Sequence, residues 1–254
     1  MDYTLKEMMA IAAARQIKNN DIVFCGTGIS MVAAMAAKNI NAPDSYIFFE
    51  TGAIDSFLEE LPMAVADPRV MYQASVTSSL LDSFAFMQNR KTGKRVVGIL
   101  GAAQIDTYGN LNSTVIGDYH NPDVRFSGSG GACDVASFVN TTLIFMKLEK
   151  RKFVRKLDYM TSPGWLTGPG SRTEHGLPET GPWAVITDMG IMGFDSFSKE
   201  MYLKGIYPGI KPGMILDNMS FDIDISRAEE ILPPEKNELE ILRNKVDPDK
   251  LILG

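Results

Sequence analysis

The chain has 254 residues, 45% of them hydrophobic, and a formal net charge of −6 at pH 7. This length suits one large α/β domain with a full core or two small domains, and the acidic balance argues against a nucleic-acid-binding protein, which needs a basic face. Because the longest apolar runs fall well short of the ~18 residues of a membrane span, and because the N-terminus lacks a basic segment followed by an apolar one, we expect a cytoplasmic protein.

The N-terminal part of the chain predicts a helix, a buried strand and a second helix. Thr4 precedes Glu7 by three residues, as in a capping box, and apolar residues recur at helical spacing over residues 4–19. Residues 21–25 form an apolar run typical of a buried strand, and the alanine- and methionine-rich residues 29–39 predict a helix.

A glycine turn, Gly26-Thr27-Gly28, lies between this strand and the second helix. Strand, glycine turn and helix is the layout of an anion-binding loop, because the N–H groups at a helix N-terminus point toward the ligand. The pattern is only Gly-x-Gly and lacks the spacing of a dinucleotide fingerprint, so a plain tight turn is an equal alternative. Thr27 and Gly28 are candidates for substrate binding.

The next expected strand runs directly into a carboxylate. Residues 46–49 are apolar or aromatic, Glu50 follows them, and Gly52 permits a sharp turn. Such a run predicts a buried strand of a parallel sheet, and ligands of open α/β sheets lie outside the carboxyl ends of the strands. We interpret Glu50 as a candidate nucleophile; the alternative is a glutamate that caps a helix or faces solvent. Three nearby carboxylates are expected on the following helix: Asp55, Glu59 and Glu60.

The rest of the chain alternates strands with helices, and irregular stretches rich in proline and glycine interrupt it at residues 55–75 and 159–181. No repeat or linker divides the sequence, so we expect one α/β domain over residues 1–254, with a mostly parallel central sheet flanked by helices. The expected strands are 94–100, 141–146, 183–187 and 220–225, a hairpin joins 188–195 to 200–206, and the expected helices are 78–91, 213–218 and 235–246.

Two loops combine features that favour ligand binding. Residues 101–114 follow an expected strand and are dense in small and amide side chains, and residues 127–134 are the most glycine-dense segment of the chain. Glycines let the backbone approach a ligand closely and can aim successive N–H groups into one cavity. The candidate binding residues of the two loops are Gln104, Asn112, Gly128, Gly130 and Gly131.

The cations and thiols are less informative. The basic residues between 147 and 156 are either a solvent-exposed face or a contact for the phosphates of an anionic ligand. Cys25 and Cys133 are far apart and predict small buried thiols, and the two histidines show no zinc-site spacing, so no metal is expected. The cations considered for phosphate contacts, on composition alone, are Lys147, Lys150, Arg151 and Arg172.

A carboxylate surrounded by backbone N–H donors is suited to attack on an activated acyl group, because the donors stabilise the oxyanion that forms. Carboxylates are weak nucleophiles, so the target needs a good leaving group, and a thioester has one. General acid–base catalysis would need a second carboxylate or a histidine nearby. His120 is such a candidate, but nothing in the sequence orients it, so nucleophilic catalysis by Glu50 is the sharper hypothesis.

These motifs and their order resemble those of the β subunits of class I CoA-transferases, and most closely the β subunits of the glutaconate CoA-transferases. The resemblance runs through nearly the whole chain. The matching segments include Gly26-Thr27-Gly28, Ala42-Pro43-Asp44, Glu50-Thr51-Gly52, Gly101 to Asn110, Ile116 to His120, Arg125 to Ala132, Tyr159 to Trp165, Val185 to Gly190 and Phe221 to Asp224.

The resemblance implies an α/β fold of the CoA-transferase (NagB/RpiA-like) superfamily and a separate α subunit that joins this chain in a hetero-oligomer. It implies coenzyme A thioesters and carboxylates as substrates, no metal, and ping-pong transfer through the catalytic glutamate, whose place Glu50 occupies. Glu50 would pass through a mixed anhydride to a glutamyl-CoA thioester, which an acceptor such as acetate would then resolve. The segment Gly128 to Gly131 matches the family's glycine loop, so the N–H groups of Gly130 and Gly131 are the expected oxyanion donors.

Two positions depart from the family pattern. Ser30 stands where the family often has proline, and Thr51 stands where the glutaconate enzymes have serine, so the acid that this chain acts on stays open. A related acyl-CoA decarboxylase or hydrolase on the same scaffold, and a non-catalytic acyl-CoA-binding subunit, are the alternative functions. The presence of Glu50 favours transfer, because the family's decarboxylases and hydrolases replace this glutamate.

Overall fold

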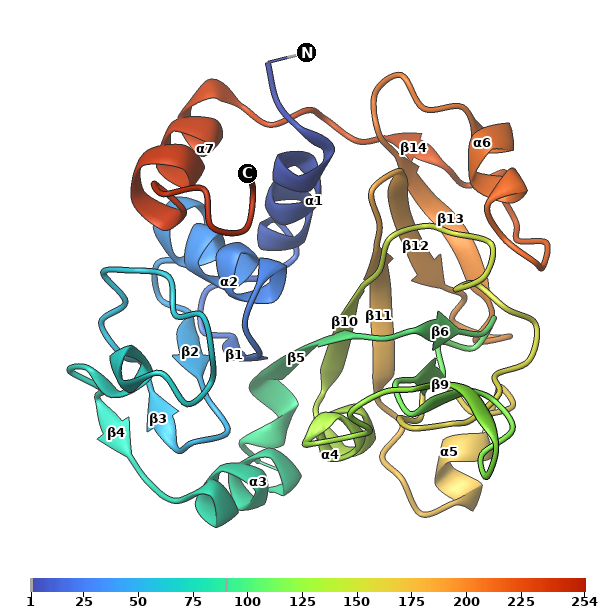
Figure 1. Cartoon of the computed structure of the whole chain (residues 1–254), viewed down its shortest axis with the longest axis horizontal. Coiled ribbons are helices and arrows are strands. Elements are labelled where there is room, and N and C mark those ends of the chain that lie inside the picture. The colour runs from blue at the N-terminus through green and yellow to red at the C-terminus, as the bar shows by residue number, and fades with distance from the viewer. Residues whose placement is uncertain (1, 90) are drawn as a thin grey trace. The chain divides into compact units, whose positions relative to one another are not determined.

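The computed structural model describes residues 2–89 and 91–254, and Figure 1 traces the chain. The chain forms two compact units. The first, called unit 1, comprises residues 1–100 with 233–254, so both ends of the chain belong to it; the second, unit 2, comprises residues 101–232. Each is described by itself.

The sheet of unit 1 carries the expected parallel strands. In spatial order its strands are β5 (Val96–Gly101), β1 (Ile22–Cys25), β2 (Tyr46–Phe48), β3 (Ala53–Ile54) and β4 (Val76–Thr77). β1 pairs in parallel with both β2 and β5, whereas β3 and β4 add antiparallel pairs beyond β2. The predicted run from 46 into Glu50 is therefore a buried strand beside β1, as expected.

The helices of unit 1 are α1 (Leu5–Ala14), α2 (Ile29–Ile40), α3 (Leu80–Gln88) and α7 (Lys236–Ile241), which a π-helical turn, Leu242–Val246, extends. Short 3₁₀ turns lie at Pro68–Met71 and Gly93–Arg95. The capping box is confirmed, because the Glu7 amide donates to Thr4 Oγ1 at 3.2 Å and the Thr4 amide donates to Glu7 Oε2 at 2.8 Å. α1 packs on α2, and α7 also contacts α2 (Figure 1), so small alanine side chains bring these helices close together.

Unit 2 is built on a mixed sheet. Its strands are β10 (Thr141–Phe145), β11 (Gly181–Ile186), β12 (Gly190–Phe194), β13 (Met201–Ile206) and β14 (Glu229–Glu230). β10 and β11 are parallel, and β11, β12 and β13 are antiparallel, which confirms the predicted hairpin. The parallel strands β1, β2 and β5 of unit 1 thus lead into the Gly26–Gly28 turn, the Glu50 turn and residues 101–114, whereas the glycine loop at residues 127–134 follows the antiparallel strand β9. The α/β class is confirmed.

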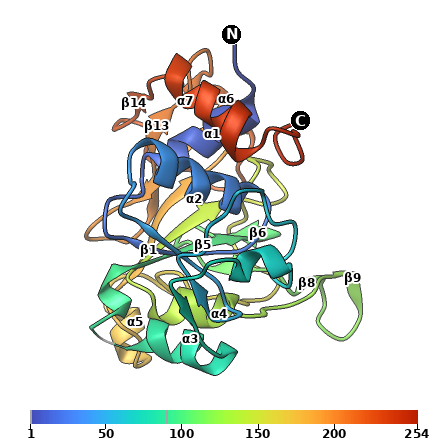
Figure 2. The ribbon, with the colours of Figure 1, turned by 90° about the vertical axis from the view of Figure 1, so that its left-hand side faces the viewer.

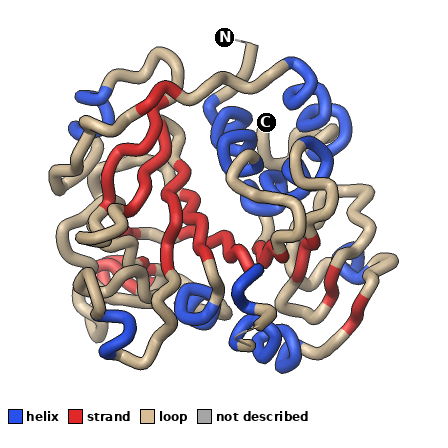
Figure 3. Tube along the Cα trace, turned by 180° about the vertical axis from the view of Figure 1, so that it is seen from behind, coloured by secondary structure: helices blue, strands red, loops and turns tan. Residues whose placement is uncertain are grey.

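Long loops and small hairpins surround this sheet (Figure 3). β6 (Gln104–Ile105) pairs with β7 (Leu111–Asn112), and β8 (Val115–Gly117) pairs with β9 (Pro122–Arg125) to make a finger that projects from the unit (Figure 2). Three short helices, α4 (Ala132–Phe138), α5 (Ser171–Glu174) and α6 (Pro212–Asp217), complete it. These paired segments are two to four residues long, so periodicity could not reveal them.

Two expectations about secondary structure are wrong. Residues 220–225 alternate like a strand but form only one isolated bridge, between Tyr202 and Asp224, since Leu203 donates to Asp224 O there. The carboxylates after Glu50 do not lie on a helix: Ala53 and Ile54 form β3, and Asp55 to Glu60 are irregular. Asp55 instead pairs with Lys38 of α2 at 2.6 Å. Among the described residues, no helix has the length and apolarity that crossing a membrane requires.

Candidate active site

Glu50 lies at the tip of a three-residue turn between β2 and β3. The Gly52 amide donates to Phe49 O at 3.0 Å, and the Phe49 amide donates to Ala53 O at 2.9 Å. Glu50, Thr51 and Gly52 therefore form a tight loop whose last residue has a φ of +100°. This is the form that three-residue hairpin loops commonly take, with glycine at the left-handed position. The turn fixes the backbone of Glu50 at the carboxyl end of a buried strand.

A second layer of contacts holds the turn. The Ser78 amide donates to Gly52 O at 2.9 Å, and Ser83 of α3, which is buried, donates to Phe49 O at 3.4 Å. A Cβ on Gly52 would lie 2.1 Å from the Ser78 carbonyl oxygen, so no other residue fits there without moving the backbone. The glutamate is therefore presented by a rigid element rather than by a flexible loop.

The Glu50 side chain is half-buried and makes no hydrogen bond or ion pair with any residue that the structure describes. Most partly buried carboxylates acquire a partner, as Asp55 does from Lys38, so an unpaired one is available for chemistry. The neighbouring Thr51 hydroxyl is also buried and unpartnered within the described part of the chain. Two adjacent polar groups without partners mark this turn as the strongest candidate site in unit 1.

The Gly26–Gly28 turn lies at the same sheet edge. Phe24 of β1 is level with Phe48 of β2, so the residues that follow each strand emerge side by side. Thr27 has no hydrogen-bond partner among the described residues, and Gly28 is the N-cap residue of α2, with a φ of +77°. Cys25, which precedes the turn, is not a competing nucleophile, because burial raises the pKa of its thiol to about 12. Both cysteines are free.

In unit 2 the glycine loop presents two unpaired amides. Gly128 is tied down, since its amide donates to Ser113 O at 3.1 Å and its carbonyl accepts from Ser113 Oγ at 3.1 Å. The Ser129 hydroxyl and carbonyl accept from Cys133 and Ala132 at the start of α4. Between these anchors, the amides of Gly130 and Gly131 donate to no described residue. Unpaired amides are one requirement of an oxyanion hole.

Gln104 and Asn112 lie side by side but are engaged with the protein. Asn112 Nδ2 donates to Gln104 Oε1 at 2.7 Å, and Gln104 Nε2 donates to Asp158 at 2.9 Å. Asn112 Oδ1 accepts from the amides of Thr114 and Val115, and Gln104 is 5% exposed while Asn112 is fully buried. Asn112 Nδ2 also donates to Val115 O at 2.6 Å, and Asp158, which Gln104 contacts, accepts from the Gly117 amide at 3.2 Å. The two amide side chains therefore hold the base of the β8–β9 finger in place.

Arg172 is not a phosphate contact. It is 2% exposed, and its guanidinium donates only to backbone carbonyl oxygens. Burial lowers its pKa to about 10, so it is still charged at neutral pH. Its acceptors are the carbonyl oxygens of Ala136 (3.1 Å), Ser137 (2.7 Å), Pro163 (3.4 Å), Gly164 (2.7 Å) and Pro178 (2.8 Å). Arg172 therefore holds the C-terminal end of α4 against the irregular segment 163–178, a role that composition does not reveal.

A family model described as coenzyme A transferase matches residues 6–218 of the chain. The chain belongs to the coenzyme A transferase family. It is 44% identical to the B subunit of glutaconate CoA-transferase from Acidaminococcus fermentans over 99% of this chain and 96% of that one. It is 37% identical to the B subunit of 3-oxoadipate CoA-transferase from Pseudomonas knackmussii, over 95% of this chain and 92% of that one.

The fold agrees with that assignment. The crystal structure of the Acidaminococcus fermentans glutaconate coenzyme A-transferase superposes with a TM-score of 0.96 and 42% identity, covering 100% of this chain and 98% of that chain. The described residues contain no group of three or more histidine, cysteine, aspartate or glutamate side chains that could hold a metal ion. The residues that sequence reasoning missed, such as Ser113, Ser78 and Ser83, are ordinary serines that act through backbone contacts.

Proposed function

We propose that this chain is the catalytic β subunit of a CoA-transferase that moves coenzyme A from an acyl-CoA to a free carboxylate. The donor would be a carboxylic or dicarboxylic acyl-CoA, and the acceptor a small acid such as acetate. The observation that carries the proposal is Glu50, a half-buried carboxylate without a partner among the described residues, on a rigid turn at a strand end. Membership of the family and the subunit names of two relatives support it.

The first half-reaction loads the enzyme. A Glu50 carboxylate oxygen attacks the thioester carbonyl, and the C–S bond breaks to give an acyl-glutamyl anhydride and the CoA thiolate. The thiolate then attacks the glutamyl carbonyl of the anhydride, which releases the donor acid as its carboxylate and leaves a Glu50-CoA thioester. No proton or electron needs to be supplied, because each step exchanges one anion for another.

The second half-reaction reverses these steps with a different acid. The acceptor carboxylate attacks the Glu50-CoA thioester and expels the thiolate, and the thiolate attacks the acyl carbonyl of the new anhydride. The new acyl-CoA leaves, and the Glu50 carboxylate is restored. Every addition passes through a tetrahedral oxyanion, and we assign its stabilisation to the amides of Gly130 and Gly131, which have no other acceptor among the described residues.

The remaining candidate residues fall into two groups, those assigned to substrate binding and those assigned to positioning. Thr27 and Gly28, at the edge shared with Glu50, are assigned to substrate binding. Gln104, Asn112 and Gly128 are assigned to positioning, because their hydrogen-bonding groups already have protein partners.

We further propose that the enzyme is a cytoplasmic hetero-oligomer in which a CoA-transferase α subunit joins this chain. Residues 1–254 would act in it as one functional domain that comprises both compact units. Two relatives that are named as B subunits support the need for a partner. Coenzyme A enters as a substrate, and the steps above require no metal ion.

The deciding experiment traps the covalent intermediate. The chain is assembled with its α subunit, incubated with an acyl-CoA and treated with hydroxylamine, which converts a glutamyl thioester to a hydroxamate, or with borohydride, which reduces it. Mass spectrometry is expected to find the modification on the peptide that holds Glu50. Glu50→Gln should lose at least about a thousandfold in turnover while remaining folded, because an amide is a poor nucleophile.

Glu59→Gln is the matched control, because Glu59 is an exposed glutamate on the irregular segment that follows β3. It should keep full activity and the adduct on Glu50. Undiminished transfer by Glu50→Gln, or an adduct on a different residue, would overturn the nucleophile assignment. Release of free CoA without any acceptor acid would instead indicate a thioester hydrolase.

A further inference from the structure

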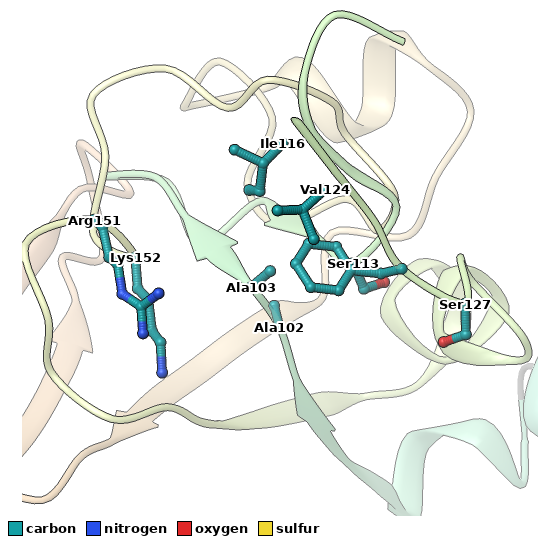
Figure 4. Close-up of a pocket in the computed structure, with 9 residues that line it drawn as sticks. Ala102, Ala103, Ser113, Ile116, Val124, Ser127, Arg151 and Lys152 are labelled. Carbon is teal, nitrogen blue, oxygen red and sulfur yellow. The ribbon is translucent and has the colours of Figure 1, made fainter. Parts of the chain in front are cut away.

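Unit 2 contains a cavity of about 590 Å³ that the assigned residues do not explain. This volume lies within the range of roughly 300–1,000 Å³ that small-molecule sites occupy. Figure 4 shows Arg151 and Lys152 on one side of the cavity and Ser127 on the other, with Ile116, Val124 and Ser113 between them. The complete lining is Ala102, Ala103, Ser113, Ile116, Val124, Phe126, Ser127, Arg151 and Lys152.

The middle of the cavity is apolar and open. Ile116 and Val124 face each other across the β8–β9 finger, and Val124 and Phe126 remain 45% and 39% exposed. Ala102 and Ala103 line the cavity with side chains of one carbon each. Exposed apolar side chains gathered on a cavity wall indicate a surface that a ligand or partner covers.

One end of the cavity adjoins the glycine loop. Ser127 directly precedes Gly128, and Ser113 is bonded to Gly128 in both directions at 3.1 Å. The Phe126 amide also donates to Thr114 O at 2.9 Å. This end therefore leads to the loop whose free amides, at Gly130 and Gly131, we assign to the oxyanion.

The other end is strongly basic. Residues 147–152 contain four cations and one carboxylate, a net of three positive charges in a chain whose net charge is −6. Glu149 is shared by Lys147 at 3.2 Å, Arg151 at 2.8 Å and Lys152 at 3.8 Å, and the bonds from Arg151 and Lys147 lower its pKa. A single carboxylate cannot neutralise these cations, so the turn attracts anions.

The two ends are held at a fixed separation by backbone hydrogen bonds. The Ile105 amide donates to Lys152 O at 2.8 Å, and the Val154 amide donates to Ile105 O at 2.9 Å. The Ala103 amide donates to Asn112 O at 2.8 Å, one residue before Ser113. The basic turn, the alanine wall and the glycine loop therefore belong to one connected framework, and the cavity is preformed.

We propose that this cavity holds the pantetheine arm of coenzyme A and that Arg151 and Lys152 bind its phosphates. The inference rests on the proposed function. The arm is a long, weakly polar chain with a thiol at one end and phosphates at the other, which matches a channel from the glycine loop to a cluster of cations. Arg151 Nε and Nη2 contact Glu149 Oε2 at 2.8 Å each, so the other edge of the planar guanidinium is the one that would donate to phosphate oxygens.

The position of the cations favours phosphates over a second carboxylate on the acyl group. The Arg151 side chain is 80% exposed and that of Lys152 is 25% exposed, so the charged end of the cavity is open to solvent. The pyrophosphate and 3′-phosphate of coenzyme A carry several charges whose full burial would be costly. A single carboxylate at the end of a short acyl chain would be better served by a buried donor set.

The test is a comparison of substrates on the double variant Arg151→Ala/Lys152→Ala, assembled with the α subunit. Loss of two charged contacts to phosphate is expected to raise KM for acyl-CoA about tenfold or more while kcat changes little. With the acyl-pantetheine thioester, which has no phosphates, the variant and the wild type should have equal KM. Arg155→Ala is the matched control, because Arg155 is 72% exposed and close in sequence but does not line the cavity.

A third substrate distinguishes the source of the anion. If the cations bound a distal carboxylate, the variant would lose affinity for a glutaryl thioester of pantetheine but not for a butyryl one, and the proposal would be overturned. Equal KM for acyl-CoA in wild type and variant would also overturn it. Ala103→Met, which fills the cavity without changing charge, should raise KM for acyl-CoA and for acyl-pantetheine alike.

These outcomes are separable from failure of the proposed function. A wild-type complex that transfers no coenzyme A would refute the activity itself, and the comparison of KM values would not arise. Direct binding of free coenzyme A, measured by calorimetry, gives a readout that needs no turnover. There the double variant is expected to bind about tenfold more weakly than the wild type.

Discussion

Replacing Arg172 by methionine tests whether a buried cation without a carboxylate partner holds unit 2 together. Methionine keeps most of the volume of the side chain but removes every donor. Four carbonyl oxygens within 3.1 Å, those of Ala136, Ser137, Gly164 and Pro178, would lose their partner. Each unsatisfied buried acceptor costs about 1–3 kcal/mol. Because carbonyls at a helix end can recover part of this from water, we expect a loss of about 3–5 kcal/mol in the free energy of unfolding.

The assay is urea unfolding followed by circular dichroism, with amide hydrogen exchange to locate the effect. Exchange should accelerate first in α4 and in residues 163–178, because these are the segments that the guanidinium joins. Arg155→Met is the control and should change the free energy of unfolding by no more than about 0.5 kcal/mol. A loss below about 1 kcal/mol for Arg172→Met, with unchanged exchange in α4, would refute the reasoning.

Two further predictions concern unit 1. Gly52→Ala should cost at least about 2 kcal/mol of stability and reduce kcat more than it raises KM, because the added Cβ would lie 2.1 Å from Ser78 O and displace the Glu50 turn. Gly176→Ala is the control, since Gly176 also has a positive φ but no atom lies within 4 Å of its added Cβ. It should cost about 1 kcal/mol and leave kcat unchanged. Arg243 donates to the Glu7 carboxylate at 2.6 Å and 3.0 Å, and these bonds lower the pKa of Glu7 below its ordinary 4.5. The pair therefore stabilises the fold fully above pH ~4.5, and this stabilisation is lost as the pH falls through the lowered pKa. The difference in unfolding free energy between wild type and Arg243→Met should therefore shrink below that pH; a difference that stays constant down to pH 3 would contradict it.

The position of Glu50 could be predicted from the sequence because each signal was local. An apolar run of four residues, a carboxylate and a glycine two residues later describe a strand, its end and a turn. The structure confirms that turn and adds what no pattern contains, namely that Ser78 and Ser83 brace it from outside. Those contacts come from residues about 30 positions away, and serine is too common a residue to signal them.

The basic residues show that composition alone does not predict whether a cation is exposed or buried. On composition alone, Arg151 and Arg172 are equivalent candidates for phosphate binding, because both lie in segments rich in charge or glycine. In the structure Arg151 is exposed at the end of a cavity, and Arg172 is buried among carbonyl oxygens. Burial depends on long-range packing, so a charged residue in an irregular segment cannot be assigned to surface or core from its neighbours alone.

For the amide side chains, sequence predicts the location but not the role. Gln104 and Asn112 follow a buried strand, as ligand-binding residues often do, and the structure does place them together. Yet Asn112 uses both its oxygen and its nitrogen on the protein, so its contribution is to shape the cavity beside it. Ser113 follows directly and reaches the glycine loop. A loop dense in amides after a strand therefore indicates a site, but whether each amide contacts substrate or holds the loop depends on how many of its hydrogen bonds the fold has already used.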